Sequence, residues 1–193
     1  YPASDTVFNV ANVIAKNATL SGLSNKVAVI EVSGKGKDRK YTYAQLNLRV
    51  NRLADALRRA GVRKGARVFV LLPNRVEILD ALLACLKIGA IYTPANFRLS
   101  AEEIRFMIKD IGAKILLYDS EYAAMVSEVI SKDIYPLTLV EVGGAKVTGS
   151  TSYDAFVKGA STREPGIKSK PGEIAVIIFT AGTTGRPKGV KLS

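Results

Sequence analysis

The sequence predicts an α/β fold, with a mainly parallel sheet and helices on both faces. First, stretches rich in Val, Ile, Leu and Phe alternate with amphipathic stretches. Second, many of the amphipathic stretches begin at capping residues and end at glycine. Third, the strand-like stretches are apolar at nearly every position, as strands covered on both faces are. Strands and helices that alternate in this way form β/α units around a parallel sheet.

The beginning of the chain predicts a helix, a strand and a second helix. Residues 4–18 carry apolar side chains at helical spacing, and residues 26–32 ("KVAVIEV") are strand-like. The basic stretch "GKGKDR" that follows lacks the third glycine of a dinucleotide-binding fingerprint, so it indicates a hairpin turn. Thr42 and Gln45 have the spacing of a capping box and begin the second helix, which Gly61 ends.

The next unit repeats the order of strand, helix and strand. Residues 66–72 ("ARVFVLL") predict a fully buried strand. We expect Asn74 and Glu77 to form a capping box for a helix that ends at Gly89. Residues 90–94 ("AIYTP") predict the following strand.

A third unit follows the same pattern. Ser100 and Glu103 cap a helix that ends at Gly112. The remaining elements before the connection are a strand at 114–118, a helix at 120–131 and a strand at 137–142. Residues 143–172 are rich in Gly, Ser, Thr and Lys and predict a surface connection that contains one short helix at 152–160.

The composition is that of a folded protein. Of 193 residues, 48% are hydrophobic and 23% are charged, and the longest apolar runs have six residues, too short to span a bilayer. A net charge of +11 arises partly from basic clusters at 35–40 and 58–67. Because aromatic residues are not interleaved with these charges, a solvated basic surface is favoured over a nucleic-acid surface.

Cysteine and histidine usage restricts the chemistry. Cys85 is the only cysteine, so no disulfide forms within the chain, and an apolar setting predicts a small buried side chain in a reducing, cytoplasmic protein. The chain contains no histidine, which excludes His-based triads and His-containing metal sites from this segment.

The final strand, expected at 173–180, runs into "TAGTTGRPKG", which has the parts of a polyphosphate cradle. Hydroxyls can donate to phosphate oxygens, glycines let backbone N–H groups approach, and a lysine adds positive charge. The candidate phosphate-binding residues are Thr180, Gly182, Thr183, Thr184, Gly185 and Lys188. Pro187 and Gly189 stand where a Walker loop needs Gly and Ser or Thr, so this is a different loop. Composition alone also allows a plain surface turn.

The order of residues resembles a known signature. "TAGTTGRPKGV" is similar to the phosphate loop of the adenylate-forming superfamily, which includes acyl- and aryl-CoA ligases, luciferases and the adenylation domains of peptide synthetases. Ten of the eleven positions from Thr180 to Val190 agree, counting one free position, and Ala181 replaces the usual serine. The stretches that begin "YTYAQLNLRV" and "LLACLKIGAI" also resemble conserved parts of the family, so the likeness covers most of the chain.

The resemblance implies an ATP-dependent ligase that activates a carboxylic acid as an acyl-adenylate and transfers it to coenzyme A. A fatty acid is the preferred substrate, because "PANFRLSAEEI" most resembles fatty acyl-CoA ligases. An aryl acid and an amino acid are the alternatives within the superfamily. A basic nucleic-acid- or phosphate-binding module without catalysis is the alternative from another class.

The resemblance also implies that the chain is the N-terminal portion of a longer enzyme. No catalytic residue is then expected within it, and Mg²⁺ would be held mainly by residues outside it. The expected division is a core at 26–142, the connection at 143–172, and the strand with its phosphate loop at 173–193. We further expect the chain to fold alone without activity, and no strand to support the loop from downstream.

Overall fold

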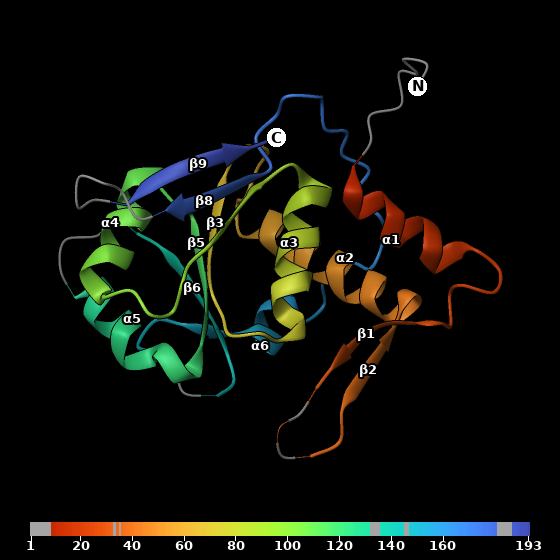
Figure 1. The fold of residues 1–193 in the computed structure, drawn as a ribbon, viewed down its shortest axis with the longest axis horizontal. Helices are drawn as coiled ribbons and strands as arrows, with labels where there is room; N and C mark the ends of the chain where they lie inside the picture. The colour runs from red at the N-terminus through yellow and green to blue at the C-terminus, as the bar shows by residue number, and fades with distance from the viewer. Residues whose placement is uncertain (1–8, 33, 35, 132–135, 145–146, 181–186) are drawn as a thin grey trace.

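A seven-stranded sheet forms the centre of the computed structural model, which describes residues 9–32, 34, 36–131, 136–144, 147–180 and 187–193 (Figure 1). The strand order is β7-β6-β5-β3-β4-β8-β9. Every neighbouring pair is parallel except β8 and β9, which are antiparallel. The strands are β3 (Arg67–Leu71), β4 (Ile91–Pro94), β5 (Ile115–Asp119), β6 (Thr138–Val142), β7 (Thr151–Ser152), β8 (Val176–Thr180) and β9 (Lys188–Leu192). The predicted fold class is confirmed.

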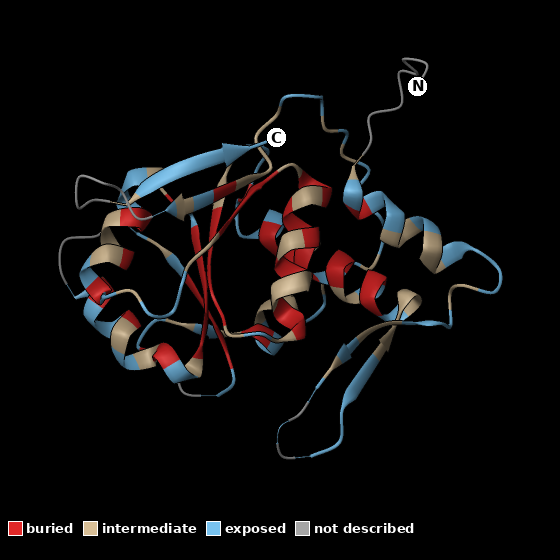
Figure 2. Ribbon diagram, in the orientation of Figure 1, coloured by how far each residue is buried: buried red, intermediate tan, exposed pale blue. Residues whose placement is uncertain are grey.

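Helices cover both faces of this sheet. Side chains alternate between faces along a strand, and β3 divides accordingly. Val68 and Val70 lie in the core shared with α2 (Tyr43–Arg59), α3 (Val76–Ile88) and α6 (Tyr153–Val157), whereas Phe69 and Leu71 lie in the core shared with α4 (Ala101–Ile111) and α5 (Ala123–Ile130). A short 3₁₀ turn, η1 (Ser120–Tyr122), precedes α5. Figure 2 shows the central strands buried between the two helical layers.

Two smaller elements lie outside the layers. Helix α1 (Val10–Thr19) packs against α2 and α3, with Ala11 fully buried and the Asn9 amide donating to the Leu86 carbonyl at 2.8 Å. Strands β1 (Val27–Glu31) and β2 (Arg39–Thr42) form a separate antiparallel hairpin that stands away from the main sheet (Figure 1). This hairpin fits the turn predicted for the basic stretch.

Local signals account for most of the helix ends. Both capping boxes, Thr42 with Gln45 and Ser100 with Glu103, are formed in both directions. Gly89 and Gly112 end α3 and α4 in the left-handed conformation, with φ of 67° and 59°, where a side chain would be strained.

The capping box predicted for α3 is wrong. The helix begins after Arg75, which makes no side-chain capping bond. The carboxylate of Glu77 instead accepts hydrogen bonds from Arg75 Nε at 2.7 Å and Arg49 Nη2 at 3.1 Å. Because charge-assisted bonds to guanidinium groups are stronger than a bond to one backbone N–H, the ion pairs determine where this side chain lies.

Within the described residues, no helix is both long and apolar enough to cross a membrane. Cys85 is buried as predicted, and burial raises the pKa of its thiol, so it behaves as a small apolar side chain.

Candidate functional site

The hairpin of β8 and β9 holds the two ends of the predicted phosphate loop together. Thr180 is the last residue of β8, Lys188 is the first of β9, and the two are cross-strand partners. Their side chains are on the same face of the hairpin, and both residues are exposed. The structure therefore brings together the first and last residues of the predicted set. The others, Gly182, Thr183, Thr184 and Gly185, lie outside the described residues, as does Ala181.

The expectation that no strand would support the loop from downstream is wrong. Residues Lys188–Leu192 form β9, which pairs with β8 along its whole length. The backbone N–H of Ala175 also donates to the Leu192 carbonyl at 2.8 Å, so the pairing extends to the start of β8. The reason is that β8 pairs with β4 on one side only, at a single position. The backbone groups on its other side need hydrogen-bond partners, and β9 supplies them.

Gly189 allows β9 to approach β8 closely. It lies opposite Phe179, and a Cβ built on Gly189 would be 3.1 Å from Ile177 Cγ2 and 3.5 Å from the Phe179 ring. The first distance is tight and would require the Ile177 side chain to move by a few tenths of an ångström, whereas the second is an ordinary van der Waals contact. The glycine of "PKGV" therefore has a packing role, which the sequence pattern did not reveal.

The position of the loop suits a ligand. Strand β8 runs parallel to β4, and the loop leaves the carboxyl end of β8. In open α/β sheets, ligands bind beyond the carboxyl ends of the strands. The Thr180 hydroxyl is within 3.5 Å of the Lys188 carbonyl, at the long limit of a hydrogen bond, so it can turn toward a ligand at little cost.

A network of buried charges lies at the same edge of the sheet, at the ends of β3 and β5. Arg75 follows β3 and donates both to Glu77 and to Asp119, the last residue of β5. Burial alone would raise the pKa of Glu77, but the hydrogen bonds from Arg75 and the backbone, together with the charges of Arg75 and Arg49, outweigh it, and the pKa of Glu77 is lowered. The carboxylate is therefore ionised at neutral pH and fixes the start of α3 to the end of β5.

The network continues into the helical layer formed by α2, α3 and α6. Asp80 is fully buried, and its Oδ2 accepts from Arg49 Nη2 at 2.6 Å and from the Tyr153 hydroxyl at 3.1 Å. Its second oxygen, Oδ1, has no partner among the described residues. Burial raises the pKa of Asp80 to about 6, although Arg49 opposes this shift. These contacts join α2, α3 and α6.

Sequence reasoning did not identify this network. Arg49, Asp80 and Tyr153 are 31 and 73 positions apart, so no local spacing connects them. One signal was present: Glu77 and Asp80 are one turn apart in a helix that is otherwise almost entirely apolar, "VEILDALLACLKI". Two carboxylates in such a helix indicate buried partners.

The described residues do not form a metal site. They contain no group of three or more carboxylate, thiol or imidazole side chains that could hold an ion. The hydroxyls and the lysine of the loop are not ligands that would hold Mg²⁺ without carboxylates or substrate phosphates.

Known proteins match this chain along almost its entire length. The model of the family described as AMP-binding enzyme matches residues 17–193. The long-chain-fatty-acid–CoA ligase FadD13 of Mycobacterium tuberculosis is 34% identical over 94% of this chain, and the 3-hydroxybenzoate–CoA ligase of an Aromatoleum species is 31% identical over 94%. A solved structure of a fatty acyl CoA synthetase from M. tuberculosis superposes with a TM-score of 0.79 at 29% identity, covering 96% of this chain and 34% of that chain.

The similarity covers only part of the length of each relative. The chain spans 34% of the length of both ligases, and thus about one third of the curated relatives it matches. Together, the family match and the similarity in sequence and fold show that this chain belongs to the family of AMP-binding enzymes.

Proposed function

We propose that this chain is the N-terminal portion of an ATP-dependent acid–CoA ligase. The observation that carries the proposal is its similarity, over 94% of its length, to relatives whose names are CoA ligases of fatty and aromatic acids. In the proposed reaction, a carboxylate oxygen attacks the α-phosphorus of ATP, and the bond to the bridging oxygen of pyrophosphate breaks. The thiol of coenzyme A then attacks the acyl carbonyl, loses its proton to solvent and displaces AMP.

The proposed role of the loop is to hold the departing pyrophosphate. Negative charge accumulates on these oxygens in the transition state, and positioned donors and cations stabilise it. Thr180, Gly182, Thr183, Thr184, Gly185 and Lys188 are the proposed contacts. The exposure of Thr180 and Lys188 on one face, at the carboxyl edge of the sheet, supports this role.

A fatty acid is the proposed substrate. The similarity to FadD13 at 34% identity supports it, and the similarity to a 3-hydroxybenzoate ligase at 31% makes an aryl acid the second candidate. We further propose a cytoplasmic enzyme without a nucleic-acid partner, in which Mg²⁺ is held mainly by residues beyond this chain. The division into a core (26–142), a connection (143–172) and a strand with its loop (173–193) remains part of the proposal.

We also propose that these 193 residues alone are inactive. Loop contacts bind phosphates, but rate acceleration also requires that the acid, ribose and adenine be held in line with the α-phosphate. The test is to incubate the 193-residue protein with ATP, Mg²⁺, palmitate and coenzyme A. Sustained formation of AMP would contradict the proposal.

The experiment that tests the activity uses the full-length protein that contains this chain. Acid-dependent exchange of labelled pyrophosphate into ATP is measured with palmitate, 3-hydroxybenzoate and phenylalanine. Exchange that is fastest with palmitate, followed by formation of palmitoyl-CoA, supports the proposal. Exchange only with the aromatic acid or the amino acid would replace the substrate class. If no acid supports exchange and the protein binds DNA with a steep loss of affinity in salt, a basic binding module is the better assignment.

A further inference from the structure

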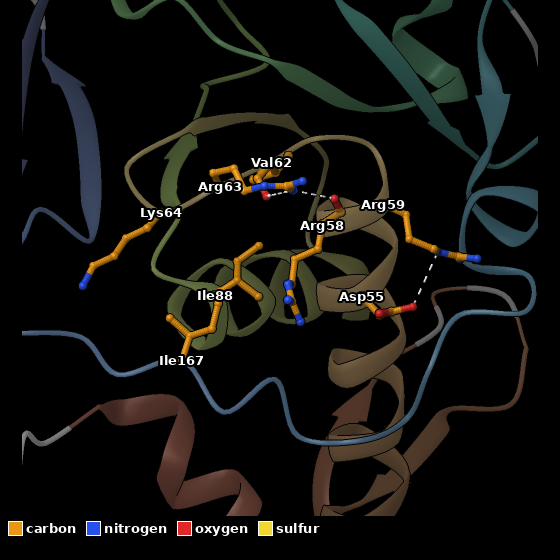
Figure 3. Close-up of a pocket in the computed structure, with 8 residues that line it drawn as sticks. All are labelled: Asp55, Arg58, Arg59, Val62, Arg63, Lys64, Ile88 and Ile167. Carbon is orange, nitrogen blue, oxygen red and sulfur yellow. Dashed lines mark hydrogen bonds and ion pairs between the residues drawn. The ribbon is translucent and has the colours of Figure 1, made fainter.

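A basic hollow lies where α2 and α3 end. It has a volume of about 370 Å³ and is lined by Asp55, Arg58, Arg59, Val62, Arg63, Lys64, Ile88 and Ile167 (Figure 3). The last turn of α2 and the residues that follow it supply the basic side chains, and Ile88 is the last residue of α3. Ile167 belongs to the connection between α6 and β8, which crosses the hollow.

The charge in this hollow is positive, because four basic side chains and one carboxylate line it, and Glu173, outside the lining, neutralises one of the four. Asp55 is already engaged, by Arg59 Nε at 3.5 Å and by the Ser161 backbone N–H at 2.9 Å. Lys64 forms an ion pair with Glu173 at 2.7 Å, and Arg63 donates from Nη1 to the Arg58 carbonyl at 2.7 Å. These three basic residues are thus held in place by the fold.

Arg58 differs from the other three basic residues. Within the described part of the chain, its guanidinium makes no hydrogen bond and no ion pair. Figure 3 shows the side chain extended between Ile88 and Asp55, across the hollow. A guanidinium presents a planar set of donors that matches two oxygens of a phosphate group. Because Arg58 is exposed, its guanidinium is open to a ligand at this concave positive surface.

The floor of the hollow is apolar. Ile88 and Val62 are 1% and 0% exposed, and Ile167 packs against the same core. An apolar floor lowers the local dielectric and strengthens the attraction between a guanidinium and an anion. Of these three residues, Ile167 is partly exposed and can contact a carbon skeleton attached to that anion.

This hollow is separate from the phosphate loop. Helices α2 and α3 lead into the amino ends of β3 and β4, whereas the loop leaves the carboxyl end of β8. Because β3, β4 and β8 are parallel, the two places are at opposite edges of the sheet. The inference therefore does not depend on the proposed ligase activity.

We propose that this hollow is a second anion site, which binds a small soluble phosphate ester or diphosphate through Arg58, with Arg63 adding positive charge. The ligand lies with its phosphate against the guanidinium and any carbon skeleton against Ile167. The bound ligand contacts both the last turn of α2 and the segment between α6 and β8, and so it stabilises both.

The test is hydrogen–deuterium exchange of the full-length protein on titration with inorganic pyrophosphate, with ionic strength kept constant by NaCl. Exchange is read separately in peptides from 55–66, from 162–170 and from the phosphate loop, so binding at one edge of the sheet does not obscure the other. Arg58→Gln removes the free guanidinium. The matched control is Arg52→Gln, since Arg52 is an exposed arginine on the same helix that does not line the hollow.

We expect protection of 55–66 and 162–170 in the wild type. Arg58→Gln should raise the half-saturating pyrophosphate concentration about tenfold or more, because a charge-assisted pair is lost, and Arg52→Gln should leave it within about twofold. No protection in the wild type, or equal effects of the two variants, overturns the proposal. Vesicles of phosphatidylcholine with phosphatidic acid form the second arm. Protection by these vesicles but not by pyrophosphate also overturns it, in favour of a membrane contact.

Discussion

Lys87 and Glu164, 77 positions apart in the chain, form an ion pair of 2.7 Å that fastens the connection between α6 and β8 to the helical layer. Lys87 is buried, and its ammonium group also donates to Asn47 at 2.6 Å and Asn51 at 2.8 Å. Asn51 in turn donates to the Thr162 carbonyl. The connection is therefore anchored from two helices, rather than lying loosely over the surface.

Breaking this anchor should loosen the connection locally. In Glu164→Ala, Lys87 keeps only neutral acceptors, and a buried cation without a counter-charge is unfavourable. We expect amide exchange in residues 158–170 to accelerate by about tenfold or more, which hydrogen–deuterium exchange measures. Glu102→Ala, an exposed carboxylate on α4, is the control and should leave this segment unchanged. If amide exchange in this segment is the same in both variants, the ion pair between Lys87 and Glu164 does not stabilise the connection.

Asp80 should make the protein less stable as the pH rises toward neutrality. Its pKa is raised to about 6 by burial, above the value of about 3.9 in an unfolded chain. Between these values the folded state binds more protons than the unfolded state, so the free energy of unfolding decreases as pH rises. Asp80→Asn removes this titration. Its stability relative to the wild type should increase from pH 4 to pH 7 by roughly 2–3 kcal/mol.

Glu77 provides a control of opposite sign for the same experiment. Its pKa is lowered, so its stabilising contribution is present above about pH 4.3 and is lost as pH falls through the folded value. Thermal unfolding of the wild type, Asp80→Asn and Glu77→Gln from pH 3 to 7 measures both. Curves for the two variants that run parallel to the wild type would contradict the assigned titrations.

Lys188→Ala should slow adenylate formation in the full-length enzyme more than it weakens binding of the acid. A cation placed against the departing pyrophosphate acts mainly in the transition state. By analogy with the loss of an oxyanion donor, we expect a decrease of roughly 10²–10³ in rate. Acid-dependent pyrophosphate exchange measures it, and Lys191→Ala, on the opposite face of β9, is the control. An unchanged exchange rate would mean that Lys188 does not stabilise the departing pyrophosphate.

Ala181→Ser restores the usual hydroxyl of the loop and should have a small effect. One neutral hydrogen bond contributes about 0.5–1.5 kcal/mol, so the KM for ATP should change by less than about tenfold. Steady-state kinetics of the full-length enzyme decide this. A hundredfold gain would mean that the site depends on the missing hydroxyl.

Gly189→Val should separate β9 from β8. The Cβ alone would lie 3.1 Å from Ile177, which is tight, and 3.5 Å from Phe179, so the two further methyl groups of valine have little room there. Hydrogen exchange in residues 176–180 should accelerate, and the KM for ATP should rise because the two ends of the loop move apart. Val190→Ala, which changes the exposed face of β9, should leave exchange near the wild-type rate.

The sequence by itself determined the features that depend on neighbours in the chain. Thr42 with Gln45 and Ser100 with Glu103 cap their helices because the groups involved are only three residues apart. Gly89 and Gly112 end helices because a local left-handed conformation excludes other side chains. The apolar strands and the order of residues after Thr180 likewise identified the parallel sheet and the family.

Only the tertiary structure decided the contacts between distant parts of the chain. Glu77 does not form the predicted capping box, because its carboxylate accepts hydrogen bonds from Arg49 and Arg75 in the folded protein. The strand β9 was missed because its exposed residues carry little periodic signal, and its stability comes from the open edge of β8. The partners of Lys87 and Asp80, and the hollow around Arg58, arise where helices converge. Such contacts depend on packing in space, and spacing along the chain does not encode them.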